Sequence, residues 1–566
     1  MNAKLKTLFS GIVAVSLAAI ISFSCSSPST SGSRPLPVPT LPEGASIDVN
    51  TATAAMVVNS MKFGWNLGNT LDANDDKANW SNQKAGTEID WGLKDTATPA
   101  LFKKLKASGI KTVRIPISWH NHVDADMNIN SAWMDHVQEV VNMAYNEGLY
   151  VIINIHHDNY NGSDSLGSKA GFTLLDADKT QSKKFVTKIW SQIAERFKDY
   201  DGHLVFETLN EPRIIGGNHE WNCTDNSWSC DTCRSTFAII NELNQAALDT
   251  IRASGSNNAN RVVMFPAYVA APYAATKAKD AGIFQIPTDS ATNRLALSVH
   301  MYTPYNFAMN PTGHSEFTAS DKSELSNHFA DLNTTFISKG IPVVIGEMGA
   351  TNRNNFEDRK AWFAYYLDLC KLYNVAAVLW DNGNETNASD PAEAFGYMNR
   401  KASGGPAWFT NSKVADLIAA AVEARGVSGN NDNNGGAGSD SGNSKTIWTG
   451  TQDLKHWDGA DGITLNASSF STATASTKIR FTISIGADCT AADCTNNYST
   501  IQPITAWTDG NINFPESNTS HQLEVSPSAS ASTVTITPDS ASWTTIKSKG
   551  LILYGHKVVI TKIELL

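Results

Sequence analysis

The sequence predicts an α/β protein, a barrel of eight βα units followed by a small all-β sandwich. The first observation is an alternation, between Ser60 and Arg425, of short apolar runs with longer segments whose apolar residues recur at three- and four-residue spacing. The second is a change after residue 445, where polar and apolar residues alternate with a period of two. A chain of 566 residues is long enough for two domains, each with its own core.

Eight apolar runs predict eight β-strands, because each run is short and ends at a polar or glycine-containing segment. Helical patterns such as ALFKKLKASG, WMDHVQEVVNMAYNEG and FVTKIWSQIAERFKDY lie between them. Eight βα units in a segment of this size favour a closed (β/α)8, or TIM, barrel. The predicted strands occupy residues 63–69, 112–118, 149–156, 203–211, 261–268, 295–302, 342–349 and 375–383.

The segments before the barrel and between the two domains differ in composition from the domains themselves. Lys4 and Lys6 precede an apolar run from Leu8 to about Phe23, which is typical of an export signal and shorter than the roughly 20 apolar residues of a membrane span. A Ser/Pro-rich tether follows it, and a linker rich in Gly, Asn and Ser separates the barrel from the sandwich. The predicted divisions are signal 1–25, tether 26–50, barrel 51–425, linker 426–445 and sandwich 446–566.

Cys25 ends the signal among small residues, in a setting that resembles the lipidation site of bacterial lipoproteins. Ser22 departs from that motif, which usually has Leu at this place. Two alternatives therefore stand, lipid attachment at Cys25 or simple cleavage and release. Both place the mature protein at the cell surface or in the medium, where disulfides are permitted.

Three other cysteines crowd one segment, at Cys223, Cys230 and Cys233. With His219 nearby they raise the alternative of a zinc site, but we favour a loop disulfide with one spare thiol. Cys370 lies in a helical pattern and is most simply a buried thiol.

The composition narrows the class of partner. A net charge of -11 argues against binding to polyanions, so nucleic acid is not expected as a partner. The 15 Trp and 14 Tyr offer flat apolar faces on which sugar rings can stack, although core positions would use the same residues.

Polar side chains gather where the predicted barrel strands end, which is where the chemistry of such barrels lies. Glu211 and Glu347 follow strands four and seven, which face each other across the barrel mouth. Hydrolysis of an acetal between sugars needs a proton donor and a carboxylate, and two such groups supply both. The full set at the strand ends is Arg114, His156, His157, Asn210, Glu211, His300, Tyr302, Glu347 and Trp380.

The two carboxyl groups need different environments to take different roles. We expect Arg114 and Tyr302 to keep Glu347 ionised as a nucleophile. We expect Glu211, without such partners, to hold a proton near neutral pH, and Asn210 to hydrogen-bond the sugar hydroxyl beside the reacting carbon.

Seven motifs in order, GWNLGNTLDA, VRIPISW, VIINIHHD, LNEPR, SVHMYTP, VIGEMG and LWDNG, resemble glycoside hydrolase family 5 over nearly all of residues 60 to 425. The resemblance implies that Glu211 is the acid/base and Glu347 the nucleophile, and that Trp380 is a platform under the sugar at the cleavage point. It implies a supporting shell of Arg114, His156, Asn210, His300 and Tyr302. At His157 the family varies.

The first and last motifs look most like the subfamily of endoglucanases, lichenases and xyloglucanases. The resemblance therefore implies an exported endo-β-1,4-glucanase that acts on a β-glucan as a monomer, without cofactor. The alternatives are a xyloglucan-specific enzyme, a mannanase, or a glycan-binding surface protein without activity. The choice among glucans depends on loop aromatics such as Trp80, Trp91 and Trp221. His156, His157 and Asp158 suggest a metal cluster, but the resemblance assigns the histidines to hydrogen bonding, so no metal is expected.

The C-terminal sandwich carries aromatic residues that suggest a carbohydrate-binding module for an insoluble polysaccharide. The alternative is that these residues fill a core or dock on the barrel. Cys489 and Cys494 flank a short polar loop and predict a local disulfide. The aromatic residues are Trp448, Trp457, Trp507, Trp543 and Tyr554.

Lipid attachment at Cys25 has a direct test. If it occurs, the native protein fractionates with membranes, because two or more acyl chains give stable anchoring, and Cys25→Ala releases it or blocks its processing. Native protein found wholly in the medium, with an N-terminus beyond Cys25, contradicts the lipoprotein alternative.

Overall fold

The computed structural model describes residues 36–566 apart from 43, 75–87, 89–90, 92–95, 161–165, 168, 222–229, 387–390, 427–444, 455–461, 471–472, 475–476, 486–498, 507–509, 519 and 526–531. The export signal, the linker, Cys25, Cys223, Cys489 and Cys494 lie outside the described residues, as do Trp80, Trp457 and Trp507.

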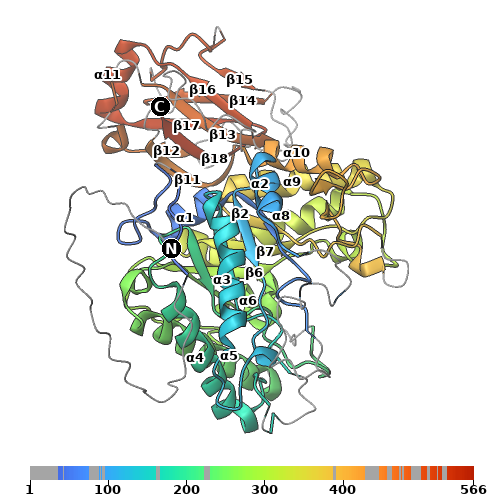
Figure 1. The fold of residues 1–566 in the computed structure, drawn as a ribbon. Coiled ribbons are helices and arrows are strands. Elements are labelled where there is room, and N and C mark those ends of the chain that lie inside the picture. Colours follow the sequence, from blue (N-terminus) through green and yellow to red (C-terminus); the bar gives the residue numbers. More distant parts are fainter. Residues whose placement is uncertain are drawn as a thin grey trace, which may run out of the picture.

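Eight parallel strands close into a barrel in the order of the sequence, which confirms the predicted TIM barrel (Figure 1). Each predicted run contains a strand, but most of the strands are shorter because the last residues of those runs leave the sheet and form the barrel mouth. The strands are β1 Phe63–Asn66, β2 Thr112–Ile115, β3 Tyr150–Asn154, β4 Leu204–Glu207, β5 Val263–Pro266, β6 Leu295–His300, β7 Val343–Met348 and β8 Ala376–Leu379.

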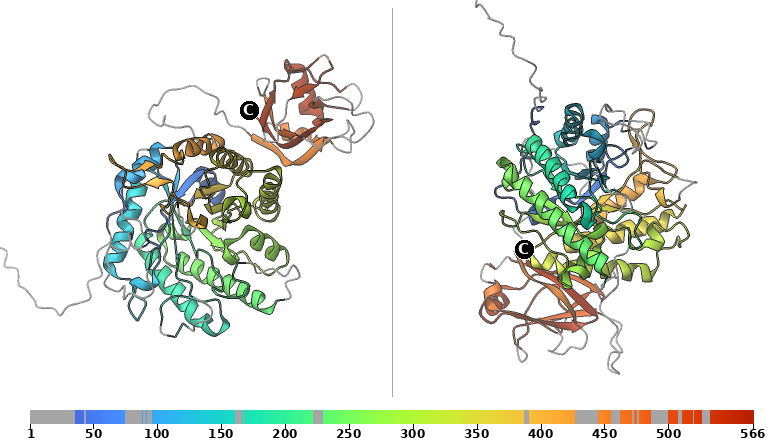
Figure 2. Two further views of the ribbon diagram at one scale, coloured as in Figure 1. Left: turned by 90° about the vertical axis from the view of Figure 1, so that its right-hand side faces the viewer. Right: turned by 90° about the horizontal axis from the view of Figure 1, so that it is seen from below.

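Helices surround the barrel and bury one face each against the outside of the strands (Figure 2). Threonine side chains cap two of them, since Thr98 accepts from the amide of Leu101 and Thr318 forms a capping box with Asp321. The helices are α2 Pro99–Ala107, α3 Ser131–Asn146, α4 Lys179–Phe197, α5 Asp231–Ala253, α6 Pro272–Asp280, α7 Tyr305–Ala308, α8 Ala319–Thr335, α9 Phe356–Tyr373 and α10 Val414–Arg425. No helix among the described residues is long and apolar enough to cross a membrane.

The interior of the barrel is divided into an apolar and a polar layer. Near the strand starts, residues such as Ile152, Val205 and Met264 pack in one cluster with helix α1, Ala54–Met61, which closes that end. One step further along the strands the inward positions become polar and remain fully buried. These polar positions are Asn66, Arg114, Asn154, Glu207 and Ser298.

The C-terminal domain is the expected β-sandwich of two antiparallel sheets. Its core contains residues such as Phe481, Leu553 and Ile560. Figures 1 and 2 show it beside the barrel, next to the end at which the barrel strands begin. One sheet holds β11 Lys445–Leu454, β18 Val558–Leu565, β13 Ile479–Ile485 and β16 Ser532–Ile536; the other holds β12 Ile463–Leu465, β17 Leu551–His556, β14 Ser499–Ile504 and β15 Leu523–Val525.

The described aromatic residues of the sandwich serve mainly its core. Trp543, in helix α11 Ser540–Lys549, is buried and donates its indole N–H to the carbonyl of Thr477 at 3.0 Å. Trp448 is partly buried and packs against the same cluster. For Trp543 the core alternative is therefore correct, whereas Tyr554 remains partly exposed.

Candidate active site

Glu347 lies on β7 at the barrel mouth and is held by two donors. Arg114 donates to Oε1 at 2.9 Å and the Tyr302 hydroxyl donates to Oε2 at 2.8 Å. Both partners lie where the sequence analysis placed them. Burial and the negative charge of Glu347 raise the pKa of Tyr302 well above its ordinary value, so the phenol stays neutral and keeps its proton for this bond.

Arg114, on β2, is the centre of the polar layer. Its guanidinium is fully buried and donates to Glu207 at 2.8 Å as well as to Glu347. Burial opposes its charge, but the two carboxylates raise the pKa of Arg114, so it is a permanent cation. It also donates to the side-chain oxygen Oδ1 of Asn210 at 2.6 Å. The amide nitrogen of Asn210 is thereby left free to donate to a ligand, which is the orientation that a sugar hydroxyl requires.

Glu211 has partners that the sequence analysis did not expect. Its Oε1 lies 2.7 Å from Nδ1 of His300, and its Oε2 lies 3.5 Å from Arg213. Burial by itself would raise the pKa of Glu211, but the hydrogen bond and charge of His300, together with the charge of Arg213, lower it. The expectation that Glu211 lacks partners and holds its own proton is therefore wrong for this state of the protein.

The surroundings of the neighbouring imidazole favour its charged form. Burial opposes the charged form of His300, but the charges of Glu347 and Glu211 and the hydrogen bond with Glu211 raise its pKa above the ordinary value. His300 and Glu211 thus form a coupled pair of titratable groups, with Nδ1 of His300 2.7 Å from Oε1 of Glu211.

The two carboxylates converge on one point. An oxygen of Glu211, an oxygen of Glu347 and a nitrogen of His300 all lie within 4.8 Å of one another. In glycosidases that retain the anomeric configuration the carboxyl groups lie about 5–5.5 Å apart, whereas inverting enzymes leave about 6.5–9.5 Å for a water molecule. The approach of these two oxygens to within 4.8 Å favours the shorter of the two spacings.

The histidines after β3 form one wall of the site together with Trp380. The ring planes of His156 and Trp380 are within 5° of parallel, with centroids 6.1 Å apart. Burial and the nearby charges of His157 and Arg114 lower the pKa of His156 well below its ordinary value, so the ring is neutral. His157 is more exposed and approaches Asp72 at 3.6 Å.

Asp158 does not join the two histidines that precede it. One of its oxygens accepts from the amides of Trp119 and His120 at 2.8 and 2.6 Å. Asp72 stands near the histidines instead, with ligand atoms of Asp72, His156 and His157 within 4.8 Å of one another. Oxygens of Asp72 already accept from the amides of residues 69 and 70, which gives this group a hydrogen-bonding role.

Glu207 is the main site residue that the sequence analysis missed. It lies on β4, four residues before Glu211, and accepts hydrogen bonds from Arg114, Asn154 and Ser298 at 2.5 to 2.8 Å. The sequence contains a feature that could have identified it, because an acidic residue in an otherwise apolar strand needs a buried partner. Asn66 is a second missed residue, and it accepts from Arg114 at 3.0 Å.

Gly346 on β7 lets the polar layer pack closely. A β-carbon at this position would lie 3.1 Å from Nε2 of His300 and 3.4 Å from Oε1 of Glu207. Both contacts are tight for a methyl group, so a larger residue here would displace His300 from Glu211.

Asp381 of the LWDNG motif anchors the loop after β8. It is buried and accepts from the indole N–H of Trp65 at 2.7 Å and from the amides of Tyr397 and Met398 at 3.1 and 2.8 Å. The anchored loop leads into the two-stranded sheet of β9 Met398–Asn399 and β10 Ala407–Trp408. Asp381 therefore has a structural role next to the site.

Two of the three loop aromatics named from the sequence are exposed in the structure. Trp221 has 61% of its surface exposed and stacks on the guanidinium of Arg213 at 4.4 Å. Trp91 is 37% exposed, and its ring lies 5.2 Å from that of His157. Both are near residues of the site and offer apolar faces to a polymer.

Two carboxyl groups that approach each other this closely, a histidine within hydrogen-bonding distance of one of them and exposed aromatic residues near the site indicate a glycoside hydrolase. A family model described as Cellulase (glycosyl hydrolase family 5) matches residues 71–386. The chain belongs to this family, as the motifs indicated, and is an endoglucanase.

Individual relatives agree with this assignment. Endoglucanase 1 from Ruminococcus albus is 38% identical over 360 residues, which cover 62% of this chain and 79% of that protein. A broad specificity endoglucanase from Ruminococcus champanellensis with bound cellotriose superposes with a TM-score of 0.58 at 36% identity, covering 66% of this chain and 98% of that one. A lichenase from Caldicellulosiruptor sp. F32 gives 0.59 at 35% identity, with 69% and 99% covered.

The buried pair of Arg114 and Glu207 yields a prediction. Glu207→Gln removes one charge of a fully buried pair, so it should lower the free energy of unfolding by about 3–5 kcal/mol. It should also reduce kcat on soluble β-glucan, because Arg114 is then free to shift away from Asn210 and Glu347. Denaturant unfolding and steady-state kinetics measure the two effects. Glu195→Gln, at an exposed pair with Lys198, is the matched control and should change neither. A Glu207→Gln variant as stable and active as the wild type contradicts this account.

Proposed function

We propose that this endoglucanase cleaves internal β-1,4-glucosidic bonds by double displacement, with Glu347 as nucleophile and Glu211 as acid/base. The observation that carries the proposal is the approach of the two carboxylates within 4.8 Å. Direct attack by water needs a wider gap, so the second carboxylate must itself attack the sugar.

In the first step Glu347 attacks the anomeric carbon while the bond to the departing sugar breaks. Arg114 and Tyr302 fix its two oxygens, so one lone pair is aimed at the substrate. The leaving oxygen needs a proton, which Glu211 delivers. We propose that His300 supplies this proton, which crosses the 2.7 Å hydrogen bond to Glu211 as the sugar oxygen approaches.

In the second step water hydrolyses the glycosyl ester on Glu347. Glu211 has now given up its proton and accepts one from the attacking water, which returns the site to its starting state. The amide nitrogen of Asn210 donates to the sugar hydroxyl beside the reacting carbon, because its carbonyl oxygen is engaged by Arg114.

The substrate that we propose is a cellulose-type or mixed-linkage β-glucan. The support is the similarity to a broad specificity endoglucanase with bound cellotriose and to a lichenase. A reducing-sugar assay on carboxymethylcellulose, barley β-glucan, xyloglucan and mannan separates this proposal from its alternatives. Product from xyloglucan alone favours a xyloglucan-specific enzyme, product from mannan alone a mannanase, and no product at all a glycan-binding protein.

Export fits the same proposal. A polysaccharide is too large to enter a cell, so an enzyme that shortens it acts at the surface or in the medium, which is where the export signal expected at residues 1–25 would send the chain.

The two glutamates can be told apart by substitution. Glu347→Gln should lower kcat by about a thousandfold or more on every substrate while binding persists. Glu211→Ala should lose about 10²–10⁴-fold on polysaccharide but form the intermediate from an activated aryl β-cellobioside, whose leaving group needs no proton. Added azide should then speed turnover of Glu211→Ala and give a β-glycosyl azide. A β-glycosyl azide from Glu347→Gln instead would reverse the assignment, whereas an α-glycosyl azide would come from a single direct displacement and would agree with it.

The shared proton of the Glu211–His300 pair predicts a change in pH dependence. Because Glu347 and Glu211 raise the pKa of His300, the pair keeps its proton to higher pH than Glu211 alone could. In His300→Gln only Glu211 can hold this proton, so the alkaline limb of kcat/KM should move to lower pH. His314→Gln, at a distant pair with Asp321, is the control and should leave the limb in place. If the alkaline limb of kcat/KM in His300→Gln stays in place or moves to higher pH, the proposal that His300 and Glu211 share the proton is wrong.

We also propose that the C-terminal sandwich binds an insoluble polysaccharide. Its support is a separate core and a linker sequence between it and the barrel. Deleting residues 446–566 should leave activity on soluble glucan unchanged, since the solved endoglucanases that align with this chain cover only 66–69% of it. Adsorption to insoluble glucans should fall. Equal adsorption with and without the domain, across several polysaccharides, rejects the binding role.

A further inference from the structure

Trp221 is the most exposed large apolar side chain among the described residues, and the proposed reaction does not yet use it. Its exposed fraction is 61%, and the guanidinium carbon of Arg213 lies 4.4 Å from the centre of its ring. One face of the indole is therefore covered by Arg213, and the other is free to meet a ligand. A single exposed apolar side chain needs no explanation by itself, so the position of Trp221 decides what it does.

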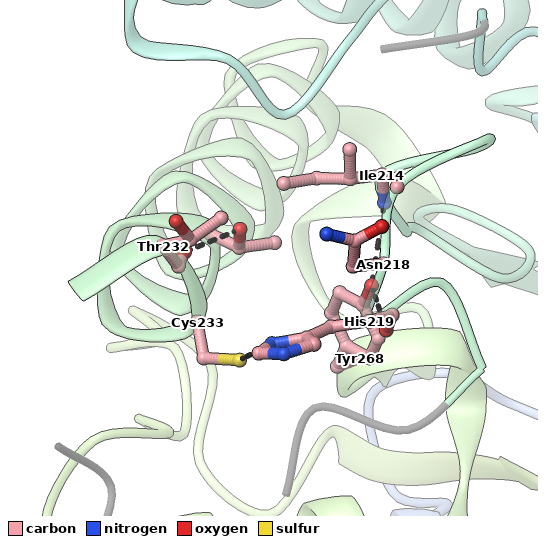
Figure 3. Close-up of a pocket in the computed structure, with 8 residues that line it drawn as sticks. Ile214, Asn218, His219, Thr232, Cys233 and Tyr268 are labelled. Atoms are coloured by element: carbon pink, nitrogen blue, oxygen red, sulfur yellow. Dashed lines mark hydrogen bonds between the residues drawn. The ribbon is translucent and has the colours of Figure 1, made fainter. Parts of the chain in front are cut away.

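The loop that carries Trp221 is anchored at two of its carbonyl groups. The carbonyl of Trp221 accepts a hydrogen bond from the hydroxyl of Tyr273 at 3.0 Å, and the carbonyl of His219 accepts from the hydroxyl of Tyr268 at 2.9 Å. Figure 3 shows His219 and Tyr268 in the pocket behind this loop, with the ring of His219 facing the sulfur of Cys233. A ring on an anchored loop loses little conformational entropy when a ligand stacks on it.

The cysteines beside this loop hold it without a metal. Cys233 is part of a disulfide and Cys230 is a free thiol, which agrees with the loop disulfide and spare thiol favoured from the sequence. A disulfide sulfur does not bind zinc as a thiolate does, so the zinc alternative does not fit this structure.

Trp221 lies on the side of the barrel mouth that holds the proposed acid/base. The guanidinium on which it stacks, that of Arg213, donates to the backbone carbonyl of Glu211 at 3.2 Å and lies 3.5 Å from its carboxylate. Arg213 also pairs with Glu220 at 3.2 Å, so its guanidinium is held from several directions. One side chain therefore contacts both the proposed proton donor and the exposed indole.

Trp380 lies on the opposite side of the mouth. It follows β8, whereas Trp221 lies in the segment after β4, and strands four and eight face each other in a closed barrel of eight strands in sequential order. The family resemblance implies that Trp380 lies under the sugar at the cleavage point. A glucan that rests there and presents its glycosidic oxygen to Glu211 continues over Arg213 toward Trp221.

We propose that Trp221 is a stacking platform for the part of the glucan that departs in the first step. The proposal rests on the function proposed above, in which Glu211 protonates the oxygen of the departing sugar. The axial C–H groups of a β-glucose ring form a flat apolar face, which matches the free face of an indole. In the second step the same platform holds an incoming sugar, whose hydroxyl takes the place of water.

The first test compares a substrate that has sugars beyond the cleaved bond with one that has none. Trp221→Ala should lower kcat/KM on barley β-glucan at least about tenfold, but on β-cellobiosyl fluoride, whose leaving group is fluoride, less than about threefold. Trp221→Phe keeps a flat apolar ring and should recover most of the loss on β-glucan. Equal losses of Trp221→Ala on the two substrates overturn the proposal.

Transfer to an added sugar tests the platform in the second step. After β-cellobiosyl fluoride has formed the ester on Glu347, a hydroxyl of added cellobiose attacks the anomeric carbon, the ester bond breaks and the hydroxyl proton passes to Glu211. The cellobiose concentration that gives half-maximal transfer should rise about tenfold in Trp221→Ala. Trp91→Ala, at the exposed indole beside His157, is the matched control and should leave this concentration in place. An unchanged concentration in Trp221→Ala overturns the proposal.

The outcomes separate this proposal from the function on which it rests. A wild type that releases neither sugar from β-glucan nor fluoride from β-cellobiosyl fluoride refutes the proposed function. An active wild type that transfers nothing to cellobiose, or whose Trp221→Ala variant shows no selective loss on β-glucan, refutes the platform alone.

Discussion

One buried cation determines how the mouth of the barrel is built. Arg114 is fully desolvated, which is costly unless its charge is paired. Its fixed fork of donors reaches Glu207, Glu347 and Asn210 from β2, so a single side chain sets the position of three groups that belong to two other strands and their ends, β4 and β7. Lysine has one point charge and cannot replace this geometry. The precision of the site therefore comes from the polar layer beneath it rather than from the loops above.

The layering of the barrel separates stability from chemistry. Helix α1 and an apolar layer close one end, so the polar layer at the other end can hold buried charges without exposing the core. The same layer reaches both glutamates of the site. His300 approaches Glu211 at 2.7 Å from β6 and Arg114 at 3.5 Å, and Arg114 donates to Glu347, so these side chains are parts of one network.

Sequence reasoning predicted the architecture and the convergence of the site, because strand order in a (β/α)8 barrel fixes which strand ends face each other. It failed where the answer depended on side-chain direction. Glu207 was read as part of an apolar strand, although it pairs with Arg114. Glu211 was expected to lack partners, but His300 lies 2.7 Å away. For Trp543, periodicity could not separate a binding face from a core face, and the structure places it in the core.

In the mechanism that we propose, Glu211 and Glu347 stand too close for water to attack directly, so the sugar passes through a covalent intermediate. The anomeric configuration of the first product tests it most directly, because two displacements preserve the configuration and one inverts it. ¹H NMR recorded during the first minutes of β-glucan hydrolysis, before mutarotation, should show the β anomer. Early product in the α configuration would mean that the two carboxyl groups act as an inverting acid and base, which contradicts the account.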